Sequence, residues 1–419
     1  MENDFMAQDV QTPDNVSHYP VGSDTESASE TESALWQDHE GVHYNIDIDQ
    51  VSMPPPHMFL QPVSPRKNVQ KEQKSQGVQV DVPITHELAE LRAEVQNLRR
   101  ENKALKLKER GNQRSAKDRA EKKFEWMQET EEKFYFFTGL EVKEFSVLYE
   151  FLNPESADLV FWKEESKGKP TLSFKCQLAM TLWRLRRGIT ITELSSHFDI
   201  CHEMISRIFI TWIQFIYHTF NDIRSAMFVP REFHKPVPSG FRNAMLRDTR
   251  IVIDCTELFT ESSRDYSQQG NMYSSYKSHA TYKVLIGVAP CGACMFVSDA
   301  FEGSISDKQI VKDSKFIDHL APGDVVLADR GFTIHDLCAQ KGATLEIPPF
   351  KDGRPALTKD ELHKTKLISR ARIHVERFNE RIKKYRILSG IIPLELVPLL
   401  SQIVFITCCL ANFKEPLAK

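Results

Sequence analysis

From about residue 250 onward, short runs rich in valine, isoleucine and phenylalanine alternate with longer stretches of helical spacing. Runs of four to eight such residues, bounded by glycine, proline or acidic residues, are typical of buried strands. Strands that alternate with helices predict a mixed α/β domain in which helices flank a sheet. The strand-like runs are 250–255, 281–290, 294–301, 324–329 and 343–348, and a long basic helix is expected over Leu367–Leu388.

Two of these runs bring an aspartate to the end of a predicted strand. Ile251–Ile253 leads into Asp254, and Val325–Ala328 leads into Asp329. A third acid, Glu376, lies on the long basic helix, at the border of its apolar face. Each acid also has an ordinary explanation, because aspartates commonly cap turns and helical glutamates commonly face water.

A carboxylate cluster would have a defined chemistry. Three carboxylates drawn together repel one another, and a cation relieves that repulsion. Hard oxygen ligands suit Mg²⁺ or Mn²⁺. Two such ions held close together activate a water and stabilise the leaving oxygen, which is the chemistry of phosphodiester cleavage. Glu257 lies close to Asp254 in the sequence and is a competing candidate.

Charge is unevenly distributed along the 419 residues. The net charge is −4, yet residues 1–60 contain twelve acidic residues and no lysine or arginine, which leaves +8 on residues 61–419. A basic body suits a polyanionic partner such as DNA, although charge alone also fits an ordinary domain with an acidic tail. The leader, 1–80, is rich in Ser, Pro and acids and is expected to be disordered.

Residues 81–130 are predicted to form a coiled coil and a basic helix. From Ile84 to Leu107, apolar residues recur in steps of four and three, with Leu91, Leu98 and Leu105 at d positions. Asn102 falls at an a position, which favours a parallel two-stranded pairing. We therefore expect a homodimer through this segment, the alternative being one amphipathic helix packed on its own domain.

Residues 131–225 have the helical spacing of a helix-turn-helix domain. Helices are expected over Leu172–Gly188, Thr190–Ile200 and Cys201–Phe220. In that arrangement, the start of the third helix would present His202, Glu203, Ser206 and Arg207 outward, where they would contact DNA. A plain helical bundle has the same periodicity and is an equal alternative.

Cysteine usage and the absence of a signal peptide favour a reduced, intracellular protein. None of the eight cysteines precedes Cys176, and Cys291 and Cys294 lack a second ligand pair at the spacing of a zinc site. The most apolar segment, Ile391–Phe413, contains Pro393, Glu395 and Pro398. It is expected to be a buried helix, so no membrane partner is predicted.

Five sequence blocks resemble the DDE-type, transposase-derived endonucleases of the Harbinger-like group. They are IVIDCTE, YKSHATYKVLIGVAP, DAFEGSISDKQI, VVLADRGF and ARIHVERFNERIKKYRIL, in the order and with gaps compatible with that group. KCQLAMTLWRLRRGITITELSSHF is similar to the helix-turn-helix that precedes the catalytic domain in such proteins. The resemblance spans about Phe136 to Phe413 and implies a ribonuclease-H-like fold over 245–415.

The resemblance also implies roles for particular residues. The three acids of the family fall on Asp254, Asp329 and Glu376, which would be both catalytic residues and ligands of Mg²⁺ or Mn²⁺. Gly331 would let the strand turn sharply after Asp329. The basic residues similar in type to positions expected near DNA are Lys277, Lys283, Arg377, Arg381 and Lys384. Many relatives have an N-terminal zinc module, which is absent here, so a separate DNA-binding partner protein is a further expectation.

The sequence thus predicts a nuclear, metal-dependent DNA endonuclease or transposase. One alternative is a catalytically silent, domesticated transposase that acts as a DNA-binding or chromatin-interaction protein. Another is a dimeric scaffold with no role on nucleic acid. Cleavage in the presence of a divalent metal, and a steep fall of DNA affinity with salt, would separate the three.

Overall fold

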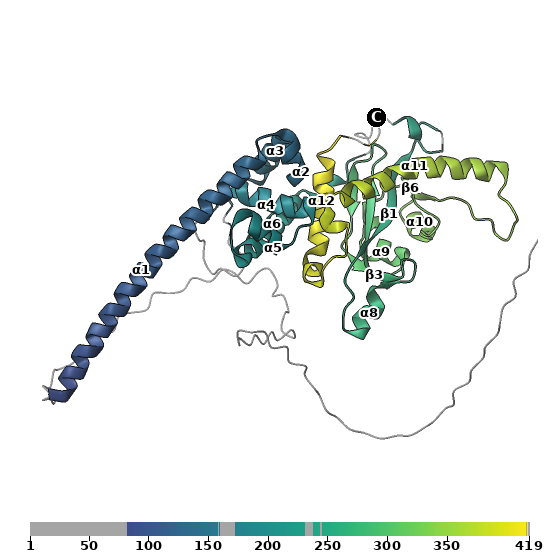
Figure 1. Cartoon of the computed structure of the whole chain (residues 1–419). Helices are drawn as coiled ribbons and strands as arrows, with labels where there is room; N and C mark the ends of the chain where they lie inside the picture. The colour runs from purple at the N-terminus through teal and green to yellow at the C-terminus, as the bar shows by residue number, and fades with distance from the viewer. Residues whose placement is uncertain are drawn as a thin grey trace, which may run out of the picture. The chain divides into compact units, whose positions relative to one another are not determined.

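The computed structural model describes residues 82–157, 159, 172–230, 238–243, 245–415 and 417. The leader at 1–80, expected to be disordered, lies outside the described residues. Figure 1 shows a group of helices followed by a sheet with helices on both sides. The two parts are connected through α6 (His202–Asp222), which packs against α12 (Leu400–Asn412) of the C-terminal part.

The first described element, α1 (Val82–Met127), is one continuous helix of 46 residues. Its C-terminal end is anchored, because Ala120, Phe124 and Met127 are buried against the helices that follow. Side chains from His86 to Lys108, in contrast, are all exposed. The predicted coiled coil and the predicted basic helix are therefore parts of one helix whose N-terminal half has no contact partner among the described residues.

The remaining helices of the N-terminal part begin and end at clear capping residues. They are α2 (Glu131–Thr138), α3 (Val142–Leu152), α4 (Phe174–Arg187), α5 (Ile191–Phe198), α6 and α7 (Arg224–Met227). Thr190 and Glu193 form a capping box at the start of α5. Gly188 ends α4 with φ of 64°, and a Cβ there would lie 2.9 Å from the backbone carbon of Arg386. A glycine at this position therefore permits α4 to approach the C-terminal part closely.

The C-terminal part is built on a mixed sheet of seven strands. Its main path has the order β2-β3-β1-β6-β7, while β4 and β5 pair with β3. β1 pairs antiparallel with β3 and parallel with β6, and β6 pairs parallel with β7. The strands are β1 (Thr249–Phe259), β2 (Tyr273–Ser274), β3 (His279–Val288), β4 (Cys294–Val297), β5 (Phe301–Glu302), β6 (Val325–Leu327) and β7 (Thr344–Glu346).

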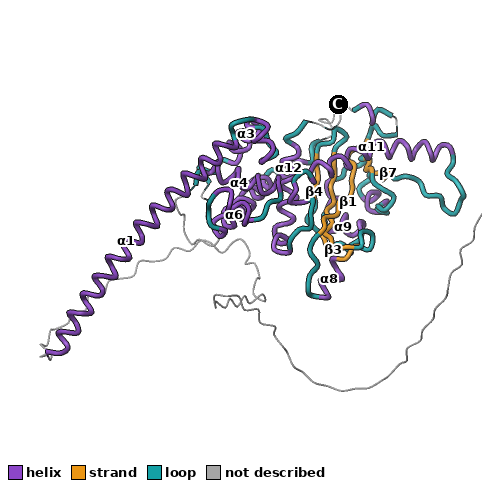
Figure 2. Tube along the Cα trace, viewed as in Figure 1, coloured by secondary structure: helices purple, strands orange, loops and turns teal. Residues whose placement is uncertain are grey.

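Helices cover both faces of this sheet (Figure 2). Val252 and Leu327 face α11 (Lys359–Lys383) and α12, whereas Ile251, Ile253 and Val326 pack into a second core on the other face. This alternation is the two-residue period of a strand buried on both sides. The second core is completed by α9 (Asp307–Asp313), η4 (Phe316–His319) and α10 (His335–Gln340). The remaining short helices of the C-terminal part are η3 (Ser239–Phe241), α8 (Tyr266–Met272), η5 (Arg386–Leu388) and η6 (Leu394–Leu399).

The predicted fold class is confirmed: the sheet with flanking helices is consistent with a ribonuclease-H-like fold. One local prediction was wrong. β1 does not end at Asp254 but continues to Phe259, because residues 254–259 pair with β3. The chain does turn at Gly331 after Asp329, and the turn closes through a hydrogen bond from the Phe332 amide to the Asp329 carbonyl, without a positive φ at Gly331.

The apolar C-terminal segment forms α12. A stretch of 19 residues, Leu394–Asn412, is long and apolar enough to cross a membrane, judged by length and composition only. In the structure, Leu400 and the residues from Ile403 to Ala411 are buried, and α12 packs against α6 and α11. That packing is the packing of a core helix.

Candidate active site

Asp254 and Asp329 lie side by side because of the register of two parallel strands. Val252 is paired with Leu327 between β1 and β6. Asp254 follows two residues later on β1, and Asp329 follows two residues after Leu327, just beyond the end of β6. Side chains two residues apart point to the same face of a sheet. The two carboxylates are therefore on the face that α11 covers.

Helix α11 brings Glu376 to the same place. Asn379, one turn after Glu376, donates from Nδ2 to Asp254 Oδ2 at 2.9 Å. Arg372, one turn before Glu376, donates from Nη1 to Asp329 Oδ1 at 3.1 Å and lies 3.7 Å from Glu376 Oε1 through Nη2. Three polar residues on one stripe of α11 thus connect the helix to both aspartates, and the three predicted acids converge.

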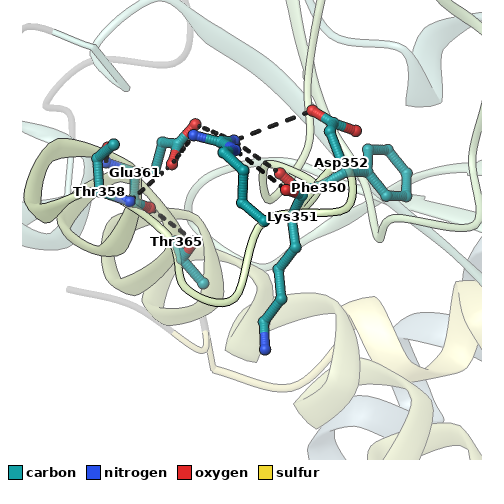
Figure 3. A network of polar contacts seen from close by, with 7 residues as sticks. Phe350, Lys351, Asp352, Thr358, Glu361 and Thr365 are labelled. Carbon is teal, nitrogen blue, oxygen red and sulfur yellow. Dashed lines mark hydrogen bonds and ion pairs between the residues drawn. The ribbon is translucent and has the colours of Figure 1, made fainter.

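The position of α11 is fixed at its N-terminal end by a polar network (Figure 3). Arg354 donates from Nη2 to Glu361 Oε1 at 2.8 Å, and Thr358 and Glu361 form a capping box. These contacts hold the pKa of Glu361 down to about 2, mainly through the hydrogen bond from Arg354. The network explains why α11 begins at Lys359, eight residues before the start predicted from apolar spacing.

The electrostatics of Asp254 are those of a carboxylate in an acidic cluster. Burial raises its pKa to about 6, and the nearby Arg372 opposes that rise. The negative charges of Asp329, Glu376 and Asp307 add to the rise. Asp329 and Glu376 are more open to solvent, with about half of each side chain exposed. The site therefore contains one buried and two accessible carboxylates.

The raised pKa of Asp254 has a measurable consequence for the metal-free protein. The folded chain holds this proton more tightly than the unfolded chain, so the stabilisation present below about pH 4 is lost as the pH rises to about 6. We expect Asp254→Asn to stabilise the metal-free protein at pH 7 by up to about 3 kcal/mol, since two pKa units correspond to roughly that amount. Near pH 4 the variant and parent should unfold alike. Urea unfolding in EDTA across this pH range checks the prediction, and a difference that does not vary with pH would contradict it.

Asp307 is a fourth acid near the site that the sequence did not single out. It is the first residue of α9, after the N-cap Ser306, and Lys283 Nζ lies 3.5 Å from its Oδ1. The thiol of Cys255, next to Asp254 on β1, also donates to Asp307. Only the spatial approach of α9 to β1 reveals this residue, because its surroundings in the sequence are those of an ordinary helix start.

The donor set fits a hard divalent cation. Asp254, Asp329 and Glu376 offer carboxylate oxygens. Asp254 is largely buried, and among the described residues its carboxylate forms no ion pair with a Lys or Arg side chain. Within the described residues, no group of three or more His, Cys, Asp or Glu side chains is close enough to hold a metal ion as arranged. The guanidinium of Arg372 lies between two of the acids, 3.1 Å from Asp329 Oδ1 and 3.7 Å from Glu376 Oε1.

The basic residues expected near DNA lie in different surroundings. Arg377 is exposed on α11 beside Glu376, and Lys277 and Lys384 are also exposed. Lys283 is mostly buried and is engaged by Asp307 and by the carbonyl of Ile305 at 3.1 Å. Arg381 donates to the carbonyl of Glu415 at 3.0 Å, so it fastens the C-terminal segment to α11.

The residues expected to read DNA lie at the start of α6, which follows α5 after a short turn. His202 and Glu203 are exposed, and Ser206 and Arg207 are half-buried. Arg207 Nη2 lies 2.6 Å from Glu203 Oε1, so part of its charge is compensated within the helix. The turn includes Asp199 in a left-handed conformation, and Asp199 forms an ion pair with Arg119 of α1.

The sheet is consistent with a ribonuclease-H-like fold, and its three acids lie on β1, just after β6 and on the covering helix α11. The comparison with protein families agrees: residues 253–412 match the family model described as DDE superfamily endonuclease. This part of the chain is therefore similar to that family, and the matched range includes Asp254, Asp329 and Glu376. The searches of curated proteins and of solved structures found no match.

Proposed function

We propose that the protein is a divalent-metal-dependent DNA endonuclease of the transposase type. The observation that carries the proposal is the register that places Asp254 beside Asp329, under a helix that brings Glu376 to both. The match of residues 253–412 to the model of a nuclease family supports DNA as the substrate. The positions of Asp254, Asp329 and Glu376 in the fold support these three side chains as the ones that would carry out the reaction.

The three acids share one role in this mechanism. Asp254, Asp329 and Glu376 would hold Mg²⁺ or Mn²⁺, which when bound supplies an activated water or 3′-hydroxyl and stabilises the leaving oxygen. Asn379 holds the carboxylate of Asp254 in position through its amide. Arg372 lies between Asp329 and Glu376. With a metal ion held by these carboxylates, its guanidinium would be available to bind a DNA phosphate.

The proposal is tested by nicking of supercoiled plasmid by the full chain. We expect conversion to the open-circular form with Mg²⁺ or Mn²⁺ and none with EDTA. DNA binding that persists without any cleavage, across both metals and several DNA substrates, would instead support the silent, DNA-binding alternative. A DNA affinity that is flat between low and moderate salt would contradict both, since phosphate contacts release counterions.

DNA recognition is proposed to involve two surfaces. His202, Ser206 and Arg207 at the start of α6 would contact bases or phosphates if α5 and α6 act as a helix-turn-helix. Lys277, Arg377 and Lys384 are exposed cations of the catalytic part and would contact phosphates, while Lys283 and Arg381 have structural contacts that limit such a role.

Three further proposals concern the setting in which the protein acts. The chain would work in the nucleus as a homodimer formed through 84–107. A separate DNA-binding protein would assist target recognition. The exposed heptad positions of α1 support the dimer, and DNA as substrate supports the nucleus.

A further inference from the structure

The N-terminal half of α1 presents an apolar stripe that nothing in the described chain covers. Leu88, Leu91, Val95, Leu98 and Leu105 are between 44% and 66% exposed, although they lie at the a and d positions of consecutive heptads. In proteins, most of the stability of a helix comes from packing of its apolar face and not from intrinsic helix propensity. The stripe therefore requires a partner helix.

The charges that flank the stripe show which partner fits. The g positions hold Glu87, Glu94 and Glu101, and the e positions hold Arg92, Arg99 and Lys106. In a parallel pair, each g residue faces the e residue five positions later on the partner helix. A second copy of the same chain, parallel and in register, therefore forms the pairs 87–92, 94–99 and 101–106, all of opposite charge and each occurring twice.

Other arrangements lose these pairs. In an antiparallel pair, g residues face g residues and e residues face e residues, so acids would meet acids and bases would meet bases. Asn102 at an a position adds to the preference, because two such amides bond to each other only when the helices are parallel and aligned. No ion pair within the described residues uses Arg92, Arg99 or Lys106.

We infer that α1 forms a parallel, in-register coiled coil with a second copy of this chain, with the g and e charges fixing both direction and register. The parallel direction places the anchored C-terminal ends of both α1 helices at the same end of the coil. Both helix-turn-helix regions and both candidate active sites then lie at one end, where they can act on one segment of DNA. The pairing itself does not depend on the proposed nuclease activity.

Charge exchange in the full chain tests the partner. We expect the parent to be a dimer in analytical ultracentrifugation at low micromolar concentration, and Glu87→Lys/Glu94→Lys/Glu101→Lys to be a monomer. Adding Arg92→Glu/Arg99→Glu/Lys106→Glu to that variant restores the net charge of the parent. It again places opposite charges at facing g and e positions, so the dimer should re-form. A parent that is monomeric, or a triple variant that stays dimeric, would overturn the inference.

Disulfide trapping tests the direction. In a parallel, in-register pair, Leu91→Cys and Leu105→Cys should each form a cross-linked dimer on oxidation, because identical d positions face each other. Ala104→Cys, which lies outside the stripe, and the parent with its eight native cysteines serve as controls. Cross-linking found only when Leu91→Cys and Asn102→Cys chains are mixed would show an antiparallel pair, in which d positions face a positions, and would refute the inference. Since the readouts are oligomeric state and cross-linking, the result stands whether or not the protein cleaves DNA.

Discussion

Asp329→Asn and Glu376→Gln are each expected to lower the rate of plasmid nicking by more than about 100-fold. The estimate follows because residues that merely orient a metal ligand contribute roughly 10–100-fold, and the loss of a ligand itself costs more. Both substitutions keep the size of the side chain and remove one negative charge. Because about half of each side chain is exposed, the fold should be retained, which circular dichroism and thermal unfolding would verify.

A surface acid supplies the matched control. Asp318→Asn removes the same charge from an exposed residue whose partner is Lys341, at 3.1 Å. Its nicking rate should stay close to that of the parent. If Asp329→Asn and Glu376→Gln cut as fast as Asp318→Asn, the assignment of the catalytic acids is wrong.

Arg372→Gln is expected to raise the affinity of the protein for Mn²⁺ by roughly tenfold. A unit charge a few ångströms from a carboxylate near a protein surface interacts by a few kcal/mol before solvent screening, and a net effect near 1.4 kcal/mol corresponds to tenfold. Removing the guanidinium leaves Asp329 and Glu376 without their internal cation. The free energy of unfolding in EDTA should therefore fall, and added Mn²⁺ should restore it.

Arg377→Gln is the control for this experiment, because it makes the same charge change on the exposed adjoining face of α11. Titration of Mn²⁺ by electron paramagnetic resonance measures the affinity without any need for cleavage. An equal gain of Mn²⁺ affinity in both variants would mean that the effect comes from the overall charge of the protein and not from the position of Arg372. A loss of Mn²⁺ affinity in Arg372→Gln would mean that Arg372 supports the metal site instead of competing for it.

Much of the catalytic fold was readable from local sequence. The short β-branched runs predicted the strands, and the position of Asp254 and Asp329 after apolar residues predicted that both would meet at the sheet. The sequence could not show that β1 continues past Asp254, because residues 255–259 depend on pairing with β3, which is more than twenty residues away. The start of α11 was missed because Thr358, Glu361 and Arg354 fix it through polar contacts, not apolar spacing.

The contacts among the acids could not be read from local sequence. Arg372 and Asn379 lie four residues before and three residues after Glu376, which identifies them as neighbours on the helix but not as partners of the aspartates. Asp307 has a helix-capping sequence, and only the packing of α9 against the sheet brings its charge to Asp254. Each of these contacts joins residues 40 or more positions apart, so tertiary structure determines them.

The most direct measurement is the anomalous diffraction of Mn²⁺ in crystals of the full chain soaked with the metal. The account predicts a peak bounded by carboxylate oxygens of Asp254 and Asp329, with Glu376 nearby and the Arg372 guanidinium turned away. A Mn²⁺-soaked crystal in which the peak lies elsewhere, and in which Arg372 still connects Asp329 with Glu376, would contradict the proposed metal-dependent cleavage.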